Sequence, residues 1–247
     1  MHTVIVSDAH LGVTNSAKAQ QQAFIGFLKT IDPARTRRLI VLGDLFDFWF
    51  EYRHVIFSGY FEVLRAFANL RDAGVELHFV CGNHDFWAGR FLHEDLGFTI
   101  YPAPTIMNMD GKRVLLAHGD GINPSDVGYR VYKKIARAKP VVALFRVLHP
   151  DWAMRLAQFV SHSSRRMFAA EDPAKGSEVG PLRAYAKGVL ERGEADVVVL
   201  GHSHYPTVEE MPAPNGAGLY VNTGDWMFHR SYATWQDGQF KLHTGSK

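Results

Sequence analysis

The chain of 247 residues lacks most features of an exported, disulfide-bonded or membrane-spanning protein. Its one cysteine, Cys81, cannot form a disulfide within the chain, so we expect a reducing, cytoplasmic setting and a buried side chain at a strand end. No run approaches the roughly 18 apolar residues that a membrane span needs. No signal peptide is expected, because the first predicted strand already begins at Thr3.

A strong charge of either sign is also absent. The 27 Lys and Arg residues nearly balance the 25 Asp and Glu residues, and the net charge of +2 does not by itself indicate nucleic acid, so no nucleic-acid partner is expected. Hydrophobic residues make up 47% and charged residues 21%, which is ordinary for a globular protein. The length and the absence of repeats predict a single domain over residues 1–247, with an insert.

Short apolar runs predict strands, and near-helical spacing of apolar residues predicts helices between them. The predicted strands cover Thr3–Ser7, Arg38–Leu42, Val75–Cys81, Thr105–Met109, Arg113–Ala117, Asp196–Leu200 and Leu219–Thr223. The predicted helices cover Ser16–Thr30 and Val55–Ala73. Asp110-Gly111 and Asp237-Gly238 are turn signals of hairpins. The order of these elements predicts an α/β fold with two face-to-face sheets and outer helices, interrupted by a helical insert (cap) at about 125–190.

The 13 histidines are numerous, and they gather in short motifs with aspartates and an asparagine. The motifs are Ser-Asp-Ala-His at 7–10, Gly-Asp-Leu-Phe-Asp at 43–47, Gly-Asn-His-Asp at 82–85, Ala-His-Gly-Asp at 117–120 and Gly-His-Ser-His at 201–204. Four of them follow a predicted buried strand. The carboxyl ends of strands are where α/β proteins place their chemistry, so we expect these motifs to form one site.

Oxygen and imidazole ligands without thiolates suit Mn²⁺, Fe²⁺ or Zn²⁺. A single histidine is more often a hydrogen-bonded core residue, but five such motifs in this order make that interpretation improbable. In an extended segment His202 and His204 would point the same way, which makes this motif stronger evidence for metal binding than Asp8-x-His10 alone. Asp44 is the candidate bridge between two metals, which in such sites lie roughly 3.5–4 Å apart.

Two residues of the third motif have open roles. His84 directly follows Asn83, so it is expected near the metals and could protonate the leaving oxygen or stabilise the phosphoryl charge. Asp85 could hold His84 in the required tautomer, or it could be a turn residue that accepts hydrogen bonds from local backbone amides. The sequence supports both interpretations of Asp85 equally.

With these motifs, the chain from Asp8 to His204 resembles the calcineurin-like metallophosphoesterase superfamily. The resemblance implies a four-layer α/β/β/α sandwich and a binuclear centre. It implies one metal held by Asp8, His10, Asp44 and His204, and a second held by Asp44, Asn83, His118 and His202. His84 matches the catalytic histidine of the superfamily.

A closer resemblance is to the UDP-2,3-diacylglucosamine hydrolases of the lipid A pathway. It is carried by Gly-Asp-Leu-Phe-Asp-Phe-Trp at 43–49, Gly-Asn-His-Asp-Phe at 82–86, His-Gly-Asp at 118–120 with Asp126 and Tyr129, and Gly-Asp-Trp at 224–226. This family cleaves the pyrophosphate of a lipid-linked UDP-sugar to UMP and a lipid sugar phosphate. The substrate contacts that it implies are Asn83, His84, Asp126, Ser164, Lys175 and His202. One departure is His84, where the best-known branch of the family has Arg.

The substrate class therefore has competing predictions. Basic and apolar residues alternate over Tyr129–Leu148, which is typical of an ordinary amphipathic helix and also of one that lies at a membrane interface. The resemblance favours a cleft for acyl chains and a peripheral contact with the cytoplasmic face of the inner membrane. The alternative is a soluble, metal-dependent phosphodiesterase or phosphatase for nucleotides or phosphoproteins, which His84 favours. A non-catalytic scaffold is a third possibility, and the intact ligand set argues against it.

Overall fold

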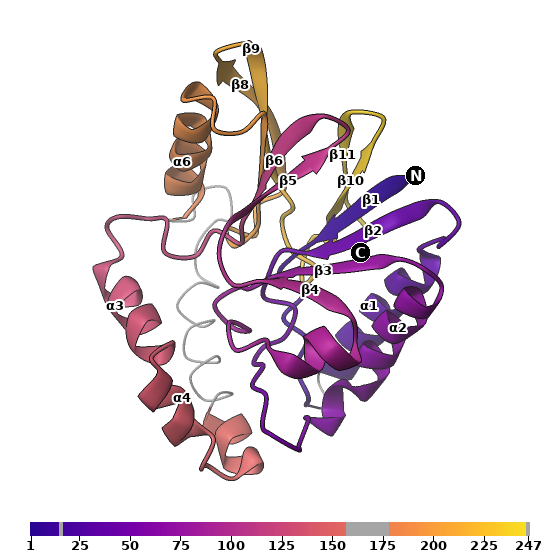
Figure 1. Cartoon of the computed structure of the whole chain (residues 1–247), viewed down its shortest axis with the longest axis vertical. Helices are drawn as coiled ribbons and strands as arrows, with labels where there is room; N and C mark the ends of the chain where they lie inside the picture. The colour runs from indigo at the N-terminus through magenta and orange to yellow at the C-terminus, as the bar shows by residue number, and fades with distance from the viewer. Residues whose placement is uncertain (15–16, 157–177, 246–247) are drawn as a thin grey trace.

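The computed structural model describes residues 1–14, 17–156 and 178–245 and arranges them around two β-sheets (Figure 1). The first sheet has the order β11 (Gln239–His243), β10 (Tyr232–Gln236), β1 (His2–Val6), β2 (Thr36–Val41), β3 (Glu76–Val80) and β4 (Phe98–Tyr101). The second has the order β5 (Thr105–Met109), β6 (Lys112–Leu116), β7 (Val197–Leu200), β9 (Gly216–Asn222) and β8 (Thr207–Ala213).

The middle of each sheet is parallel. Strands β1 to β4 pair in parallel in the first sheet, and β6, β7 and β9 do so in the second. Strands β1, β2, β3 and β6 each end in buried apolar residues, and all four residues of β7 are buried. Parallel pairing brings the carboxyl ends of neighbouring strands to one edge, so the residues that follow them meet there.

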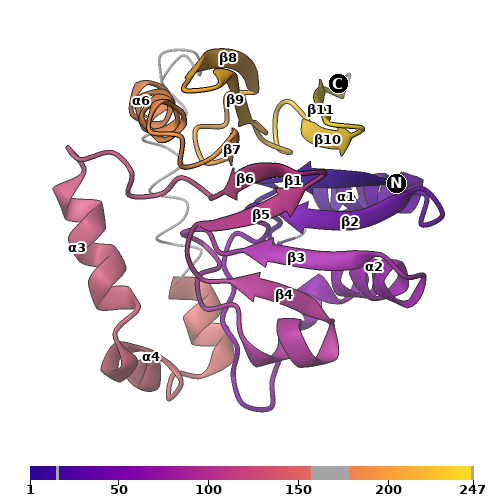
Figure 2. The same cartoon turned by 45° about the horizontal axis from the view of Figure 1, so that its top comes forward.

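Three apolar interfaces separate the four layers (Figure 2). Ile5, Ile40 and Val80 of the first sheet face Val199 and Val221 of the second and form the central interface. Helices α1 (Lys18–Thr30) and α2 (Phe61–Asp72) cover the outer side of the first sheet, and α6 (Val179–Glu191) covers the second. The predicted α/β/β/α sandwich is confirmed.

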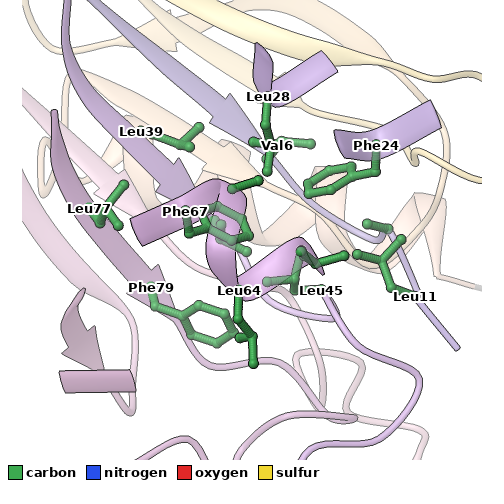
Figure 3. Packing of buried hydrophobic residues seen from close by; sticks show 14 of the residues in the cluster. Val6, Leu11, Phe24, Leu28, Leu39, Leu45, Leu64, Phe67, Leu77 and Phe79 are labelled. Carbon is green, nitrogen blue, oxygen red and sulfur yellow. The ribbon is translucent and has the colours of Figure 1, made fainter. Parts of the chain in front are cut away.

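The interface beneath α1 and α2 is rich in large side chains (Figure 3). Phe67 of α2 is fully buried and its ring lies 5.2 Å from that of Phe98 and 6.2 Å from that of Phe24. Leu77 and Phe79 project from β3 toward the same interface. This layer fixes β2 and β3 and therefore the loops that leave them.

Several boundaries differ from the sequence prediction. The helix predicted from Val55 begins later, as the short turn η2 (Ser58–Tyr60), and continues as α2. Ile56 and Phe57, at its predicted start, instead pack against the core from the preceding loop. Strands β4 and β8 were not predicted. Strand β8 contains Pro212 and two glutamates, which its place at the sheet edge allows. The hairpins at Asp110-Gly111 and Asp237-Gly238 are confirmed.

The described part of the insert is helical, with α3 (Val127–Ala136), α4 (Lys139–Phe145) and a further helical stretch at 150–156. The Trp87 indole donates a hydrogen bond to the Ala136 carbonyl at 3.1 Å, and Phe145 packs against the rings of Phe50 and Trp87. Helix α6, which the sequence places at the end of the insert, packs on the second sheet. The division into one domain with a cap at about 125–190 stays a prediction. Across the described ranges, no helix is long and apolar enough to cross a bilayer.

Truncation of Phe67 tests how much the apolar interface beneath α1 and α2 contributes to the stability of the fold. We expect Phe67→Ala to lower the free energy of unfolding by about 3–5 kcal/mol, because it leaves a cavity beneath α2. The matched control is Phe61→Ala on the same helix, where the side chain is 60% exposed, and it should cost less than about 1 kcal/mol. Urea denaturation followed by circular dichroism measures both values, and equal losses would contradict this account of the interface.

Candidate metal centre

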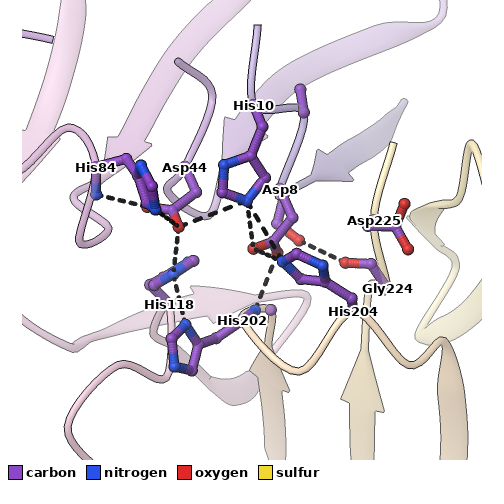
Figure 4. A network of polar contacts seen from close by, with 12 residues as sticks. Asp8, His10, Asp44, His84, His118, His202, His204, Gly224 and Asp225 are labelled. Atoms are coloured by element: carbon purple, nitrogen blue, oxygen red, sulfur yellow. Dashed lines mark hydrogen bonds and ion pairs between the residues drawn. The ribbon is translucent and has the colours of Figure 1, made fainter. Parts of the chain in front are cut away.

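The five sequence motifs meet at the edge where parallel strands of both sheets end (Figure 4). The predicted site residues follow β1 (Asp8, His10), β2 (Asp44), β3 (Asn83, His84), β6 (His118) and β7 (His202, His204). Asp8, His10, Asp44 and His118 are buried, the other four are partly buried, and the structure brings all eight into one cluster.

Two buried carboxylates organise the cluster in the same way. Asp8 accepts a hydrogen bond through Oδ2 from the backbone N–H of His202 at 2.9 Å, and Asp44 accepts one through Oδ1 from that of His84 at 2.9 Å. The other oxygen of each carboxylate faces the imidazoles. Asp8 Oδ1 lies 3.2 Å from His204 Nε2, and Asp44 Oδ2 lies 3.3 Å from His118 Nε2.

Glycines make these amide contacts possible. A Cβ on Gly82 would lie 2.2 Å from Asp44 Oδ1, and one on Gly201 would lie 2.6 Å from Asp8 Oδ2. Neither glycine has a positive φ, so close approach explains them, whereas Gly43 has a φ of 78° and fits the predicted tight turn. A larger residue at 82 or 201 would displace the carboxylate.

Five of the predicted ligands have left-handed backbone conformations. Their φ angles are 51° at Asp8, 42° at His10, 52° at Asp44, 67° at His202 and 56° at His204. Such conformations cost non-glycine residues on the order of 1–3 kcal/mol each and cluster at functional sites. The expectation that His202 and His204 lie in an extended segment is therefore wrong. Because both residues leave the extended region, their rings turn to different parts of the cluster.

The imidazole nitrogens face one another in pairs. His10 Nε2 lies 3.4 Å from His204 Nε2, and His202 Nδ1 lies 3.2 Å from His118 Nε2. The opposite nitrogen of His118 lies 2.7 Å from the Leu42 carbonyl, to which it donates, so Nε2 is directed into the cluster. Asn83 adds its Oδ1 at 3.0 Å from the same nitrogen.

This arrangement fits divalent metal ions. Ligand atoms within 4.8 Å of one another occur in three groups, Asp8–His10–His204, His10–Asp44–His84 and Asp44–His118–His202. Asp44 belongs to two of them, as expected for a bridge. The buried polar atoms of the described residues that lack a well-formed hydrogen bond include Asp8 Oδ1 and His10 Nδ1. Facing lone pairs and an unsatisfied carboxylate oxygen are costly without a cation between them.

His84 is held by a backbone group. Its Nδ1 donates to the Asp47 carbonyl oxygen at 2.8 Å, and this leaves Nε2 directed at the cluster, 3.9 Å from Asp44 Oδ2. Asp85 is fully buried and instead accepts hydrogen bonds from the amides of Leu45 and Gly82, at 2.8 and 2.9 Å. The tautomer role considered for Asp85 is thus corrected: its carboxylate binds the turn amides, and Asp47 orients the ring.

Comparison with known proteins agrees with this geometry. A family model described as calcineurin-like phosphoesterase matches residues 1–206. The chain belongs to the calcineurin-like phosphoesterase family. The resemblance drawn from the motifs is thereby confirmed, and this family consists of hydrolases.

The relatives narrow the resemblance within the calcineurin-like phosphoesterases. The chain is 32% identical to a UDP-2,3-diacylglucosamine hydrolase of Porphyromonas gingivalis (strain ATCC BAA-308 / W83), over 93% of this chain and 92% of that protein. It is 29% identical to the protein of the same name from Neisseria gonorrhoeae (strain ATCC 700825 / FA 1090), over 93% and 90%. A solved archaeal phosphodiesterase covers 99% of both chains with a TM-score of 0.50 and 14% identity, which shows the fold alone.

Within this calcineurin-like centre, the surroundings raise the pKa of some histidines and lower that of others. Burial lowers the pKa of His118, but Asp44 and Asp8 outweigh burial and raise it well above its usual value. Burial and the neighbouring His118 lower the pKa of His202 to about 4. Burial would raise the pKa of Asp8, yet His118 and His204 lower it to about 2. Without metal, protons on some imidazoles therefore balance the carboxylates.

Only some of the substrate contacts implied by the resemblance lie in the cluster of predicted ligands. Asn83, His84 and His202 lie in the cluster. Asp126 is exposed at the start of α3, where its side chain accepts a hydrogen bond from the Tyr129 amide at 2.9 Å, so it has a structural role as a helix cap. Ser164 and Lys175 lie outside the described residues. Contact of all six with substrate stays a prediction.

Two residues beside the ligands were not assigned by sequence reasoning. Asp47 orients His84 through its carbonyl and has its carboxylate 3.9 Å from His10 Nδ1. Asp120, two residues after His118, binds side chains of α3. Both belong to the motifs already quoted, so an acidic residue a few positions after a predicted ligand was the available signal.

Substitution of Gly82 tests the packing of the carboxylate. We expect Gly82→Ala to displace Asp44 and reduce the bound metal from about two ions per chain to about one or fewer. Gly26→Ala is the matched control, because a Cβ there meets nothing within 4 Å and the residue lies in α1. Metal content after dialysis, measured by inductively coupled plasma mass spectrometry, compares the two. Full occupancy in Gly82→Ala would contradict the close approach.

The raised pKa of His118, and that of His204, predict proton release on metal binding. Both imidazoles must be neutral to bind a metal, so metal displaces protons at pH 7, and affinity should weaken as pH falls. In the metal-free protein, the ion pairs of His118 with Asp44 and of His204 with Asp8 stabilise the fold. This stabilisation is complete below about pH 6.5 and is lost as pH rises through the raised pKa of each histidine. Calorimetric titration of Mn²⁺ in buffers of different ionisation enthalpy should report about one proton or more per chain. No proton release would contradict the charged state.

Proposed function

We propose that this chain hydrolyses the pyrophosphate bond of UDP-2,3-diacylglucosamine and releases UMP and a lipid sugar 1-phosphate. The main support is the length of the match, because relatives named for this substrate align over more than nine-tenths of the chain. The clustered carboxylates and imidazoles support a metal-dependent phosphoester hydrolysis.

We assign the metals as two divalent ions, with Mn²⁺ preferred and Fe²⁺ or Zn²⁺ possible on the same ligands. Asp8, His10, Asp44 and His204 would hold one ion, and Asp44, Asn83, His118 and His202 the other. The chemistry that a pair of such ions supplies is an acidified water and neutralisation of charge on the phosphoryl oxygens. The hydrogen-bonded rings of His118 and His84 need no large rearrangement for this, since backbone carbonyls already orient them.

His84 is assigned as the acid or charge stabiliser. The Asp47 carbonyl occupies its Nδ1, so only Nε2 is available to the reacting phosphate. His84 is partly buried, with 19% of its side chain exposed, so substrate can reach it beside the buried Asp44. A protonated Nε2 would donate to a phosphoryl oxygen or protonate the departing UMP or sugar phosphate oxygen. Asp47 then acts by fixing the ring.

The cap would bind the acyl chains. Val127, Val131 and Ile135 occupy one side of α3 and are each more than half exposed. Leu144, Val147 and Trp152 continue the exposed apolar surface along the cap, next to exposed Lys134, Lys139 and Arg146. Apolar side chains next to cations suit an anionic lipid and a peripheral contact with the inner membrane. Asp126, Ser164 and Lys175 are assigned to the same substrate-binding region.

A direct assay tests the assignment. Purified protein with Mn²⁺ and UDP-2,3-diacylglucosamine in mixed micelles should release UMP, and a chelator should abolish the release. His84→Ala should lower kcat by about 10²- to 10⁴-fold with its metal content unchanged, because the proton donor is lost while the ligands remain. Phosphorus NMR and mass spectrometry of the products measure the reaction.

The soluble alternative predicts a different outcome, and the histidine at position 84 is the observation that favours it. Turnover of a nucleotide diester or a phosphoprotein, with no UMP released at micromolar enzyme, would reject the lipid-linked substrate and support the alternative. Phe61→Ala, outside both the site and the cap, controls for loss of activity through handling.

A further inference from the structure

Helix α3 carries polar side chains on the side opposite its exposed apolar residues. Tyr129 and Lys133 are one helical turn apart and partly buried, whereas Val127 and Val131 are exposed. An inward side of an amphipathic helix ordinarily meets apolar core. Here its hydroxyl and ammonium groups meet a single carboxylate, that of Asp120.

Asp120 is held from α3 at three points. Its Oδ2 accepts a hydrogen bond from the Tyr129 hydroxyl at 2.7 Å and pairs with Lys133 Nζ at 2.5 Å. The same Nζ donates to the Asp120 backbone carbonyl at 3.1 Å. The Asp120 side chain is only 6% exposed, so this is a largely desolvated contact, in which charged hydrogen bonds are strong.

The anchored residue is two positions from the predicted ligand His118. The other end of this segment is fixed by the hydrogen bond from His118 Nδ1 to Leu42. Gly119 lies between them with a φ of 122°, and a Cβ there would lie 3.1 Å from Leu182 of α6 and 3.2 Å from His202 Cβ. The segment therefore packs closely against α6 at Gly119, and α3 adds its contacts at Asp120.

We propose that Lys133 and Tyr129 are positioning residues for the Asp44–His118–His202 cluster, acting through Asp120, so that the cap and one half of the metal centre are mechanically coupled. Asp120 is outside the ligand groups found among the described residues, and its carboxylate is occupied by α3. The cap thus reaches the metal centre through a protein contact as well as through substrate. Outer contacts of this kind typically change metal affinity or activity by about 10- to 100-fold.

Lys133→Met tests the coupling. The weaker of the two Mn²⁺ binding steps, measured by calorimetry on the full chain, should lose about tenfold or more in affinity. Lys133→Arg should restore most of the affinity, because it keeps a cationic donor beside Asp120. Tyr129→Phe should shift affinity in the same direction by less, and it carries the test if Lys133→Met does not fold. The matched control is Lys134→Met, which removes the same charge from the next, exposed position of α3 and should leave affinity unchanged.

The kinetic arm rests on the proposed function, whereas the metal titration does not. With the lipid-linked substrate, the proposal expects a fall in kcat with KM near wild type for Lys133→Met. Unchanged Mn²⁺ affinity in both Lys133→Met and Tyr129→Phe would overturn the coupling, and so would a raised KM with unchanged affinity, since Lys133 would then contact substrate directly. If wild type releases no UMP, the proposed function fails while the titration still decides the coupling.

Discussion

Two buried carboxylates among five imidazoles are the constraint on which the rest of the structure depends. Asp8 and Asp44 are at most 1% exposed, and burying charges without partners costs several kcal/mol for each ion. Each uses one oxygen to bind a backbone amide and turns the other toward the histidines. The amide bound to Asp44 comes from the neighbouring strand loop of the same sheet. The amide bound to Asp8 comes from the second sheet, so this carboxylate joins the two sheets at the site.

Further contacts around Asp8 also join the two sheets. Ser7 and Thr223 share a hydrogen bond of 2.7 Å between their hydroxyls, and Ser7 also donates to the Gly224 carbonyl. The Trp226 amide donates to the Asp8 carbonyl at 3.1 Å. The carboxyl ends of β1 and β9 are thus tied together across the sandwich. A displacement of one sheet relative to the other would move His204 away from Asp8 and His118 away from Asp44, so the sandwich itself sets the spacing of the metal centre.

Much of this could be predicted from the sequence, because apolar runs define buried strands and parallel strands must end at a common edge. The motifs therefore located the site before any side-chain geometry was known. The directions of the side chains could be predicted less well from the sequence. The expectation that His202 and His204 lie in an extended segment was wrong. Both residues have left-handed backbone conformations, which no sequence pattern reveals, and these turn the two rings apart. The sequence suggested Asp85 as an orienter of His84 and assigned Asp47 no role, since only the fold reveals which oxygen reaches the ring. Strand β8 could not be predicted because its place at the sheet edge allows a proline and glutamates, so it lacks the apolar run that marks a buried strand.

The charge of the buried carboxylates can be balanced by protons on the imidazoles or by divalent ions bound to the same side chains. The left-handed turns at Asp8, Asp44 and His202 lie at the ends of buried strands, and closely packed glycines stand beside the carboxylates of Asp8 and Asp44. Protons on His118 and His204 balance the carboxylates in one state, and divalent ions would replace those protons in the other. The segment after His118 packs against α6 and is also held by α3 through Asp120, and the contacts with α3 make the cap a second determinant of the same centre.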